Sequence, residues 1–341
     1  MTIRCISPIN NELYAERPCA DDAAIDAAFA SAKSAQQAWV NTSLTERAVV
    51  ISKAVDAMLA MRDEITTELA WLMGRPVKFG GGELGGFEER ARFMMDLAES
   101  ALAPVTPDPK EGFTRFISRE PLGTVFVVAP WNYPYLTAVN SIVPALMAGN
   151  AVVLKHAAQT LLVAERFQQA FDAAGLPKGL FQHLYLSHDQ TSKILGSGVA
   201  DMVNFTGSVA AGRDIERSAA GTFMGVGLEL GGKDPAYVMP DADIGAAVET
   251  LVDGSFFNSG QCCCAIERIY VHQDVYDSFV EGAAALTSGY VLGDPLDPDT
   301  TLGPMARARD ADYVRSEIDK AIAAGARGLI DAGQFDANQQ G

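Results

Sequence analysis

The stretch "TVFVVA", Thr124 to Ala129, decides the fold class, because it is a continuous apolar run without the alternation of a half-exposed strand. Such runs are typical of strands that are buried on both faces of a parallel sheet. A helix at 136–148 and a second apolar strand, "AVVLK" at 151–155, are expected directly after it. This alternation of strand and helix predicts an α/β fold with a doubly wound parallel sheet.

The same alternation continues toward the C-terminus. The expected helices lie at 160–175 and 210–221, and the expected strands at 180–186, 201–205 and 236–239. From Ile244 onward, a further helix, strand and helix predict a second α/β domain that contains a run of cysteines. Because sheets of this kind bind ligands at the carboxyl ends of their strands, a ligand site is expected at that edge.

On the N-terminal side of the first apolar run, the sequence favours helices. Ser43 and Glu46 have the spacing of a capping box at the start of a long helix. Apolar spacing and breakers predict helices at 21–40, 44–73 and 87–102. The glycine-rich segment between the last two is interpreted as a turn. The chain is therefore expected to open with helices.

Two glycine-rich segments resemble phosphate-binding motifs without matching them. "GGGELG", at 80–85, has the spacing G-x-G-x-x-G but follows a helix end instead of a strand, so it is interpreted as a flexible turn. "GSVAAGRD", from Gly207, has the glycine spacing of a P-loop, but Arg213 and Asp214 stand where that motif needs Lys and Ser or Thr. An ATPase is thus disfavoured, although a helix start after a strand suits an anion.

Composition narrows the class of partner. The 341 residues contain 26 Lys and Arg against 43 Asp and Glu, a net charge of −17, which would repel nucleic acid and anionic membranes. No signal-like segment and no apolar run long enough to span a membrane are found in the sequence. A cytoplasmic protein of about two domains is expected.

Three consecutive cysteines, Cys262 to Cys264, stand out in a chain that has only two others. They are too closely spaced to wrap a tetrahedral zinc ion, so no metal site is predicted. A buried cysteine usually behaves as a small apolar residue. A special backbone turn at Gly260 and Gln261, and Glu229 beside two glycines upstream, favour instead a thiolate nucleophile with a carboxylate that activates water.

Five segments occur in an order and at separations that resemble the NAD(P)-dependent aldehyde dehydrogenase superfamily. They are "APWNYP", "GNAVVLKHA", "NFTGS", "LELGGKDP" and "FFNSGQCCCA". The similarity covers essentially the whole chain. It implies a dinucleotide-binding domain, a thiol-bearing catalytic domain, and oxidation of a small aldehyde with NAD or NADP.

The resemblance also implies the catalytic roles. Cys263 matches the nucleophile that forms a thiohemiacetal, and Asn132 matches the side-chain donor to the oxyanion. Glu229 matches the base that activates water to release the acid from a thioester. An aldehyde gives up hydride only after a nucleophile has made its carbon tetrahedral, so these roles form one sequence. Cys262 and Cys264 are assigned to packing or to lining the substrate tunnel.

The cofactor residues that the resemblance implies are Lys155, Ser208, Gly207, Trp131 and Gly231. The lysine would hold the adenosine ribose, the serine and glycine the pyrophosphate, and the tryptophan would lie beside the nicotinamide. Gly231 would lie along the cofactor path.

Two positions depart from the pattern of the family. Ala158 replaces the glutamate that often binds the ribose 2′-hydroxyl, so NADP is expected to be tolerated as well as NAD. His156 replaces a proline that is common in the family.

The implied domains are a helical N-terminal part of the cofactor domain (1–102), a subunit-bridging strand segment (103–121), the dinucleotide-binding domain (122–231) and the thiol domain (232–341). The family continues into an "E-x-F-G-P" segment and a subunit-pairing strand that this sequence does not contain. A C-terminally truncated chain is therefore expected, and a homo-oligomer for the full-length form.

Two alternative functions stay open from the sequence. The same thiol and base would serve a cysteine-dependent esterase or thioesterase without redox chemistry. A truncated chain would also serve as a dinucleotide-binding protein with impaired turnover. A cysteine hydrolase assisted by histidine is disfavoured, because none of the four histidines lies in a recognisable catalytic motif.

Overall fold

The computed structural model describes residues 1–335, and the chain divides into two compact units. The unit that we call the sheet unit consists of Met1–Ile3, Glu16–Arg62 and Gly82–Glu229. The other, the thiol unit, consists of Arg4–Ala15, Asp63–Gly81 and the residues from Leu230 onward. The last six residues of the predicted thiol domain, 336–341, lie outside the described residues. The domain boundaries expected from the sequence stay a prediction.

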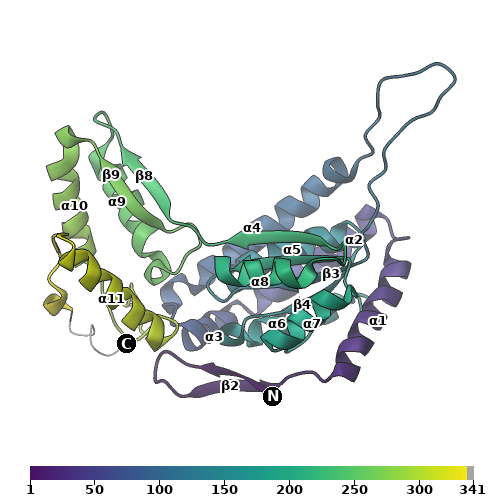
Figure 1. The fold of residues 1–341 in the computed structure, drawn as a ribbon, viewed down its shortest axis with the longest axis horizontal. Helices are drawn as coiled ribbons and strands as arrows, with labels where there is room; N and C mark the ends of the chain where they lie inside the picture. Colours follow the sequence, from purple (N-terminus) through teal and green to yellow (C-terminus); the bar gives the residue numbers. More distant parts are fainter. Residues whose placement is uncertain (336–341) are drawn as a thin grey trace. The chain divides into compact units, whose positions relative to one another are not determined.

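A five-stranded sheet forms the centre of the sheet unit (Figure 1). Its order is β5-β4-β3-β6-β7, and β3 pairs in parallel with both β4 and β6, as β4 does with β5. The strands are β3 (Thr124–Val128), β4 (Ala151–Lys155), β5 (Phe181–His183), β6 (Met202–Gly207) and β7 (Gly225–Leu230). All residues of β3 and β4 are buried, which explains their unbroken apolar sequence. The predicted doubly wound α/β fold is confirmed.

Helices α1, α5, α6 and α8 pack against the strands of this sheet. The helical segments in or entering the sheet unit are α1 (Asp22–Trp39), α2 (Leu44–Ala60), α4 (Val77–Leu102), α5 (Pro134–Met147), the 3₁₀ turn η1 (Ala158–Thr160), α6 (Leu162–Ala173), α7 (His188–Ser197) and α8 (Val209–Ala219). Phe126 of β3 meets Phe29 of α1 edge-to-face, with ring centroids 5.9 Å apart. The Ser43–Glu46 capping box at the start of α2 is confirmed.

The glycine-rich segment before residue 87 is helical, so its interpretation as a turn was wrong. Helix α4 begins at Val77 and runs through all five glycines. A Cβ at Gly80 would lie 2.6 Å from Cγ2 of Thr66, and one at Gly86 would lie 2.9 Å from Cδ1 of Leu136. These glycines let neighbouring helices approach closely, and packing outweighs their low helix propensity. The predicted helix 44–73 is also interrupted at Met61, where α2 gives way to α3 (Arg62–Met73).

The chain opens with two strands, contrary to the prediction of helices. Strands β1 (Thr2–Ile6) and β2 (Leu13–Pro18) form a two-stranded sheet. Their residues are mostly exposed, so they carry no strong apolar pattern. Between α4 and β3, the segment 103–121 forms an arm that extends away from the rest of the sheet unit (Figure 1). Isolated antiparallel bridges, such as Val105 with Ile117, replace the continuous strand expected there.

The thiol unit contains a parallel pair of strands, β8 (Asp234–Val238) and β9 (Ile266–Val271). Helix α9 (Ile244–Phe256) connects them, and its buried residues Val248 and Val252 share a core with Val238 and Phe279. The strand expected at 236–239 therefore belongs to this second sheet. The remaining helical segments of this unit, besides α3, are η2 (Phe257–Gly260), η3 (Gln273–Val275), α10 (Tyr276–Ser288), α11 (Ala308–Ala323) and η4 (Ala332–Gln334).

Within residues 1–335, no helix combines the length and the apolar character that crossing a lipid bilayer requires.

Candidate active site

Most of the predicted cofactor residues lie at one edge of the central sheet. Trp131 and Asn132 follow β3, Lys155 ends β4, and Gly207 and Ser208 lie at the end of β6. Since β3 neighbours both β4 and β6 in parallel, the carboxyl ends of the three strands lie side by side. The chain order reverses at this point, from β3-β4-β5 on one side to β6-β7 on the other. Open α/β sheets bind ligands at such a reversal.

The β6–α8 junction has the local structure of an anion site. Ser208 is the N-cap of α8, and its side chain accepts a hydrogen bond of 3.2 Å from the Ala211 N–H. A Cβ at Gly207 would lie 2.5 Å from the Phe205 ring, so a larger residue would displace this junction. Free N–H groups and the helix dipole at such a start favour a phosphate. The junction thus fits the pyrophosphate of a dinucleotide.

Lys155 brings a positive charge to the same edge. Its side chain is nearly buried, and burial lowers the pKa of its ammonium group because the charged form is poorly solvated there. Ala158 follows in η1 and is exposed. The residues present fit a dinucleotide: a cation, an N-terminal helix end and a close-approach glycine converge on the reversal point.

Two residues outside the predicted site, Glu83 and His156, hold the turn that carries Asn132. Buried Glu83, on α4, accepts hydrogen bonds of 2.9 Å from the N–H groups of Tyr135 and Leu136, in the first turn of α5. The Nε2 atom of His156 lies 3.2 Å from the Pro134 carbonyl oxygen. In the sequence, His156 was noticeable only because it replaces a common proline. Glu83 was not noticeable, because it stands in the glycine-rich segment that was interpreted as a turn.

The partners of His156 determine its protonation. Its Nδ1 atom lies 3.0 Å from the Ala157 N–H nitrogen and 3.1 Å from Oγ1 of Thr160. Because a backbone N–H only donates, Nδ1 is the acceptor, and Nε2–H donates to the Pro134 carbonyl. Burial lowers the pKa of His156 to about 4, because a second proton would charge an enclosed ring and cancel the Nδ1 acceptor.

This geometry gives His156 a measurable effect on acid stability. In the unfolded chain His156 takes up a proton near pH 6.5, but in the fold only near pH 4, so stability falls as pH falls between these values. The loss expected from this residue is about 3 kcal/mol. Urea unfolding from pH 7 to pH 4 is expected to show a smaller loss in His156→Gln than in the parent. The exposed His188→Gln variant is the control, and a parallel loss in all three proteins would contradict the assignment.

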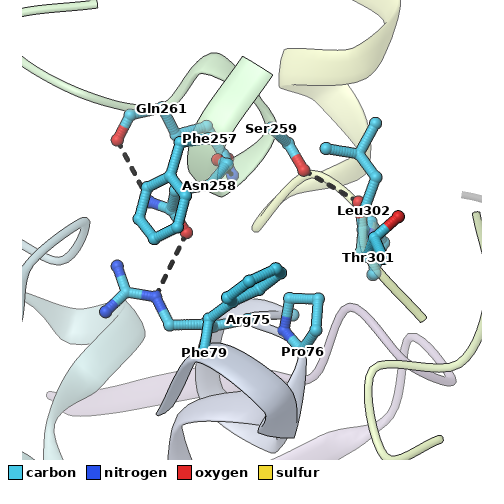
Figure 2. A pocket seen from close by; sticks show the side chains of 12 residues that line it. Arg75, Pro76, Phe79, Phe257, Asn258, Ser259, Gln261, Thr301 and Leu302 are labelled. Atoms are coloured by element: carbon cyan, nitrogen blue, oxygen red, sulfur yellow. Dashed lines mark hydrogen bonds between the residues drawn. The ribbon is translucent and has the colours of Figure 1, made fainter. Parts of the chain in front are cut away.

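The cysteine triplet follows a strained turn. Asn258, Ser259 and Gly260 all have left-handed backbone conformations, with φ angles of 55°, 57° and 71°. Two of the three are not glycine, so the turn costs on the order of 1–3 kcal/mol per such residue and must be held by its surroundings. Figure 2 shows how the neighbouring side chains hold it.

Side-chain hydrogen bonds fix this turn inside the thiol unit (Figure 2). Buried Arg75 donates from Nε to Oδ1 of Asn258 at 3.4 Å, and Ser259 donates to the Gly303 carbonyl at 2.8 Å. Gln261 donates from Nε2 to the Asn258 carbonyl at 2.9 Å and accepts from the Ala306 N–H at 2.9 Å. The backbone that leads into the triplet is therefore rigidly positioned, as a catalytic loop requires.

The three thiols lie close together. The Sγ atoms of Cys262 and Cys264 are 3.3 Å apart, and Cys263 between them is exposed. Although the residue as a whole is exposed, partial desolvation of its sulfur by the surrounding protein, followed by the charge interaction with the Cys262 thiol, raises the pKa of Cys263 above its ordinary value. The hydrogen bond with Cys262 raises the pKa of Cys264 to about 12.

Glu229 is exposed and lies near the end of β7. The glycines after it leave room around the backbone: a Cβ at Gly231 would meet no atom within 4 Å. A Cβ at Gly232 would lie 3.9 Å from the Cys263 carbonyl oxygen, so this glycine runs alongside the cysteine loop within the thiol unit. Asn132 and Glu229 belong to the sheet unit and Cys263 to the thiol unit.

Comparison with known proteins agrees with these motifs. The family model described as "Aldehyde dehydrogenase family" matches residues 1–341. A 3,6-anhydro-alpha-L-galactose dehydrogenase of Streptomyces coelicolor is 34% identical over 340 residues, which is 99% of this chain and 69% of that protein. A succinate-semialdehyde dehydrogenase [NADP(+)] of Mycobacterium bovis is 35% identical over 96% of this chain and 72% of its own.

A solved structure with the same fold is also similar in sequence. The crystal structure of PnpE in complex with nicotinamide adenine dinucleotide superposes with a TM-score of 0.90 at 32% identity, over 95% of this chain and 67% of that one. Together with the match of the family model to every residue, this leaves one assignment. The chain belongs to the aldehyde dehydrogenase family.

Proposed function

We propose that the chain oxidises an aldehyde to a carboxylic acid through a covalent intermediate on Cys263, with NAD or NADP as hydride acceptor. Membership of the aldehyde dehydrogenase family makes it an NAD(P)-dependent oxidoreductase that acts on small aldehydes. The observation that carries the covalent mechanism is the exposed Cys263, three residues after the last residue of a strained turn that is held by hydrogen bonds. Strain of this kind concentrates at functional sites.

In the proposed mechanism, the Cys263 thiol releases its proton to solvent water, and the resulting thiolate attacks the aldehyde carbonyl carbon. The carbonyl oxygen becomes an anion, which the Asn132 side-chain amide and the Cys263 backbone N–H stabilise. One such donor is worth on the order of 10²–10³ in rate. Glu83 and His156 support this role, because their hydrogen bonds to the first turn of α5 hold the turn that carries Asn132.

Lys155, Gly207 and Ser208 would hold the dinucleotide at the carboxyl edge of the sheet, with Trp131 and Gly231 along its path. When bound, the nicotinamide supplies the hydride acceptor that converts the thiohemiacetal into a thioester. Glu229 then removes a proton from a water molecule that attacks the thioester carbon. The C–S bond breaks, the acid leaves, and the sulfur of Cys263 is free for the next cycle.

The assay that tests this function also tests cofactor choice. Aldehydes of graded length and polarity, each with NAD and with NADP, are expected to give the absorbance of reduced cofactor. Oxygen-rich aldehydes are expected to be preferred, because the two similar dehydrogenases are named for a semialdehyde and an anhydro sugar. Ester hydrolysis with no reduced cofactor would favour the thiol esterase instead, and binding of cofactor without turnover would favour a binding protein.

For the cofactor, kcat/KM values with NAD and NADP are expected to lie within about a hundredfold of each other, because no carboxylate at Ala158 repels a 2′-phosphate. Ala158→Glu is expected to lower kcat/KM with NADP by about 10–100-fold and to change NAD little. Ala173→Glu, at an exposed alanine at the end of α6, is the matched control. A preference for NAD above a thousandfold in the parent would contradict the proposal.

Tyr135, in the first turn of α5, is not available to contact a substrate. It is 1% exposed and packs on Phe167 in the core of the sheet unit, with ring centroids 5.7 Å apart. Phe257, just before the strained turn, packs edge-to-face on Phe79, with ring centroids 5.5 Å apart. The aromatic residues near the site therefore give little support to an aromatic substrate.

The arm at 103–121 supports the proposal that the protein forms a homo-oligomer. Phe113, Phe116 and Ile117 are each more than 60% exposed on it. Exposed apolar side chains on a projecting segment are typical of a surface that a partner covers. A cytoplasmic location is proposed because all five cysteines are free thiols, which persist in a reducing compartment.

A further inference from the structure

The proposed mechanism uses only one of the three clustered thiols, Cys263, and gives Cys262 and Cys264 no chemical role. The Sγ atoms of Cys262, Cys263 and Cys264 all lie within 4.8 Å of one another, and those of Cys262 and Cys264 are 3.3 Å apart. Among the described residues, this is the one group of three His, Cys, Asp or Glu side chains that is close enough to share a metal ion. The cluster follows the hydrogen-bonded turn at Asn258–Gly260, so its backbone is already fixed.

The sulfur spacing fits a soft cation. Sulfur binds such ions at about 2.3 Å, so three sulfurs around a trigonal ion are about 4 Å apart and two around a linear ion about 4.6 Å apart. The observed separations, 3.3 Å between the Cys262 and Cys264 sulfurs and no more than 4.8 Å among all three, bracket these values. Three ligands on consecutive residues leave one side of the ion open, which differs from the closed four-ligand site of a structural zinc. Thiolates select the soft cations, of which Cu(I) and Cd(II) are examples.

We propose that Cys262, Cys263 and Cys264 form a binding site for a soft, thiophilic metal cation, with the sulfur of Cys263 as one of its ligands. As each metal–sulfur bond forms, the thiol releases its proton to solvent, and the cation then draws electron density from the Cys263 sulfur and covers it, so this sulfur no longer reacts with electrophiles. Cys262 and Cys264 act as additional ligands that raise the affinity of this loop for metal. Their presence beside the nucleophile makes the protein sensitive to soft metals at concentrations that a lone thiol would tolerate.

Cd(II) is the suitable probe, because it does not oxidise thiols. The whole chain, reduced with a phosphine and desalted without oxygen, is titrated with CdCl₂, and the ultraviolet charge-transfer absorption of the Cd–thiolate bond is followed. One Cd(II) per chain is expected, together with protection of Cys263 from iodoacetamide, read by peptide mass spectrometry. Neither readout needs an aldehyde or a cofactor, so the result is independent of the proposed enzymatic function.

The double variant Cys262→Ser/Cys264→Ser is expected to weaken Cd(II) binding on the order of 10²-fold, because two linked ligands are lost. Cys19→Ser, which removes a thiol outside the cluster, is the matched control and is expected to bind like the parent. If circular dichroism shows that the double variant is misfolded, Cys264→Ala and the protection of Cys263 in the parent decide the question. Undiminished binding in the cluster variants, no charge-transfer band in the parent, or free alkylation of Cys263 at saturating Cd(II) would each overturn the proposal.

Oxidation of the same thiols is a different outcome and is distinguishable. A bond between Cys262 and Cys264 would need an oxidant to take two electrons and two protons from the pair. It would leave the peptide lighter by two hydrogens and without cadmium. Finding that product in place of bound metal would make the cluster an oxidation site and overturn the metal proposal.

Discussion

Cys263→Ser is expected to lower kcat/KM for aldehyde oxidation by on the order of 10⁴-fold or more, because a serine hydroxyl at this position has no base of its own to ionise it. The affinity for NAD or NADP is expected to stay within about twofold of the parent, since the proposed cofactor contacts come from Lys155, Gly207 and Ser208. Steady-state kinetics and calorimetry with each cofactor check the two parts separately.

Cys264→Ser is the matched control for this variant. It changes the neighbouring thiol to the same residue but removes no group that the proposed mechanism uses. Its kcat/KM is expected to stay within about tenfold of the parent, the range typical of a packing change. If turnover survives in Cys263→Ser but is lost in Cys264→Ser, the nucleophile is Cys264, and the assignment to Cys263 is wrong.

Glu229→Gln is expected to stop the cycle after hydride transfer. Without a carboxylate to take a proton from water, the thioester on Cys263 hydrolyses slowly, so the steady rate is expected to fall by about 10²–10⁴-fold. Formation of the thioester does not use Glu229. Stopped-flow absorbance is therefore expected to show a burst of one reduced cofactor per active site, followed by little further reaction.

The exposed Glu216→Gln on α8 is the matched control, because it removes the same charge from the sheet unit but no group that the proposed mechanism uses. It is expected to show the steady rate of the parent. A slow, steady rate without a burst in Glu229→Gln would mean that this residue acts before hydride transfer, for instance in activating the thiol. In that case another group must activate water.

Much of the fold could be predicted because its strands are buried on both sides. All residues of β3 and β4 are buried, so their sequences are apolar apart from Thr124 at the start of β3 and Lys155 at the end of β4. The fifth strand, β7, was missed, because its residues are exposed or half-buried and two of them are glycine. The opening strands β1 and β2 were missed for the same reason.

The helical structure of the glycines in α4 could not be predicted from the neighbouring residues in the sequence. Turn chemistry favours a break at 80–86, but close packing against Thr66 and Leu136 makes small residues necessary in a helix there. Tertiary contacts of this kind cannot be read from neighbours in sequence. The error also hid Glu83, whose carboxylate accepts two backbone hydrogen bonds at the start of α5.

For the candidate site, the family resemblance supplied the proposed residues, and the structure adds how some of them are held. The alternation of strands and helices predicted a ligand site at the carboxyl ends of the strands, and Lys155 and Ser208 lie at the ends of β4 and β6. The left-handed conformations of Asn258 and Ser259 had no local signal beyond the glycine that follows them. The separation of the Cys262 and Cys264 sulfurs likewise depends on side-chain rotamers, which sequence spacing does not specify.

The account rests on a covalent bond between the Cys263 sulfur and the carbonyl carbon of the substrate. Its most direct test is mass spectrometry of Glu229→Gln, quenched with acid after one turnover with aldehyde and cofactor. The peptide that contains Cys263 is expected to gain the mass of the acyl group, and hydroxylamine is expected to remove it. An acyl group on Cys262, on Cys264 or outside the triplet, or reduced cofactor formed with no acylated peptide, would contradict the mechanism.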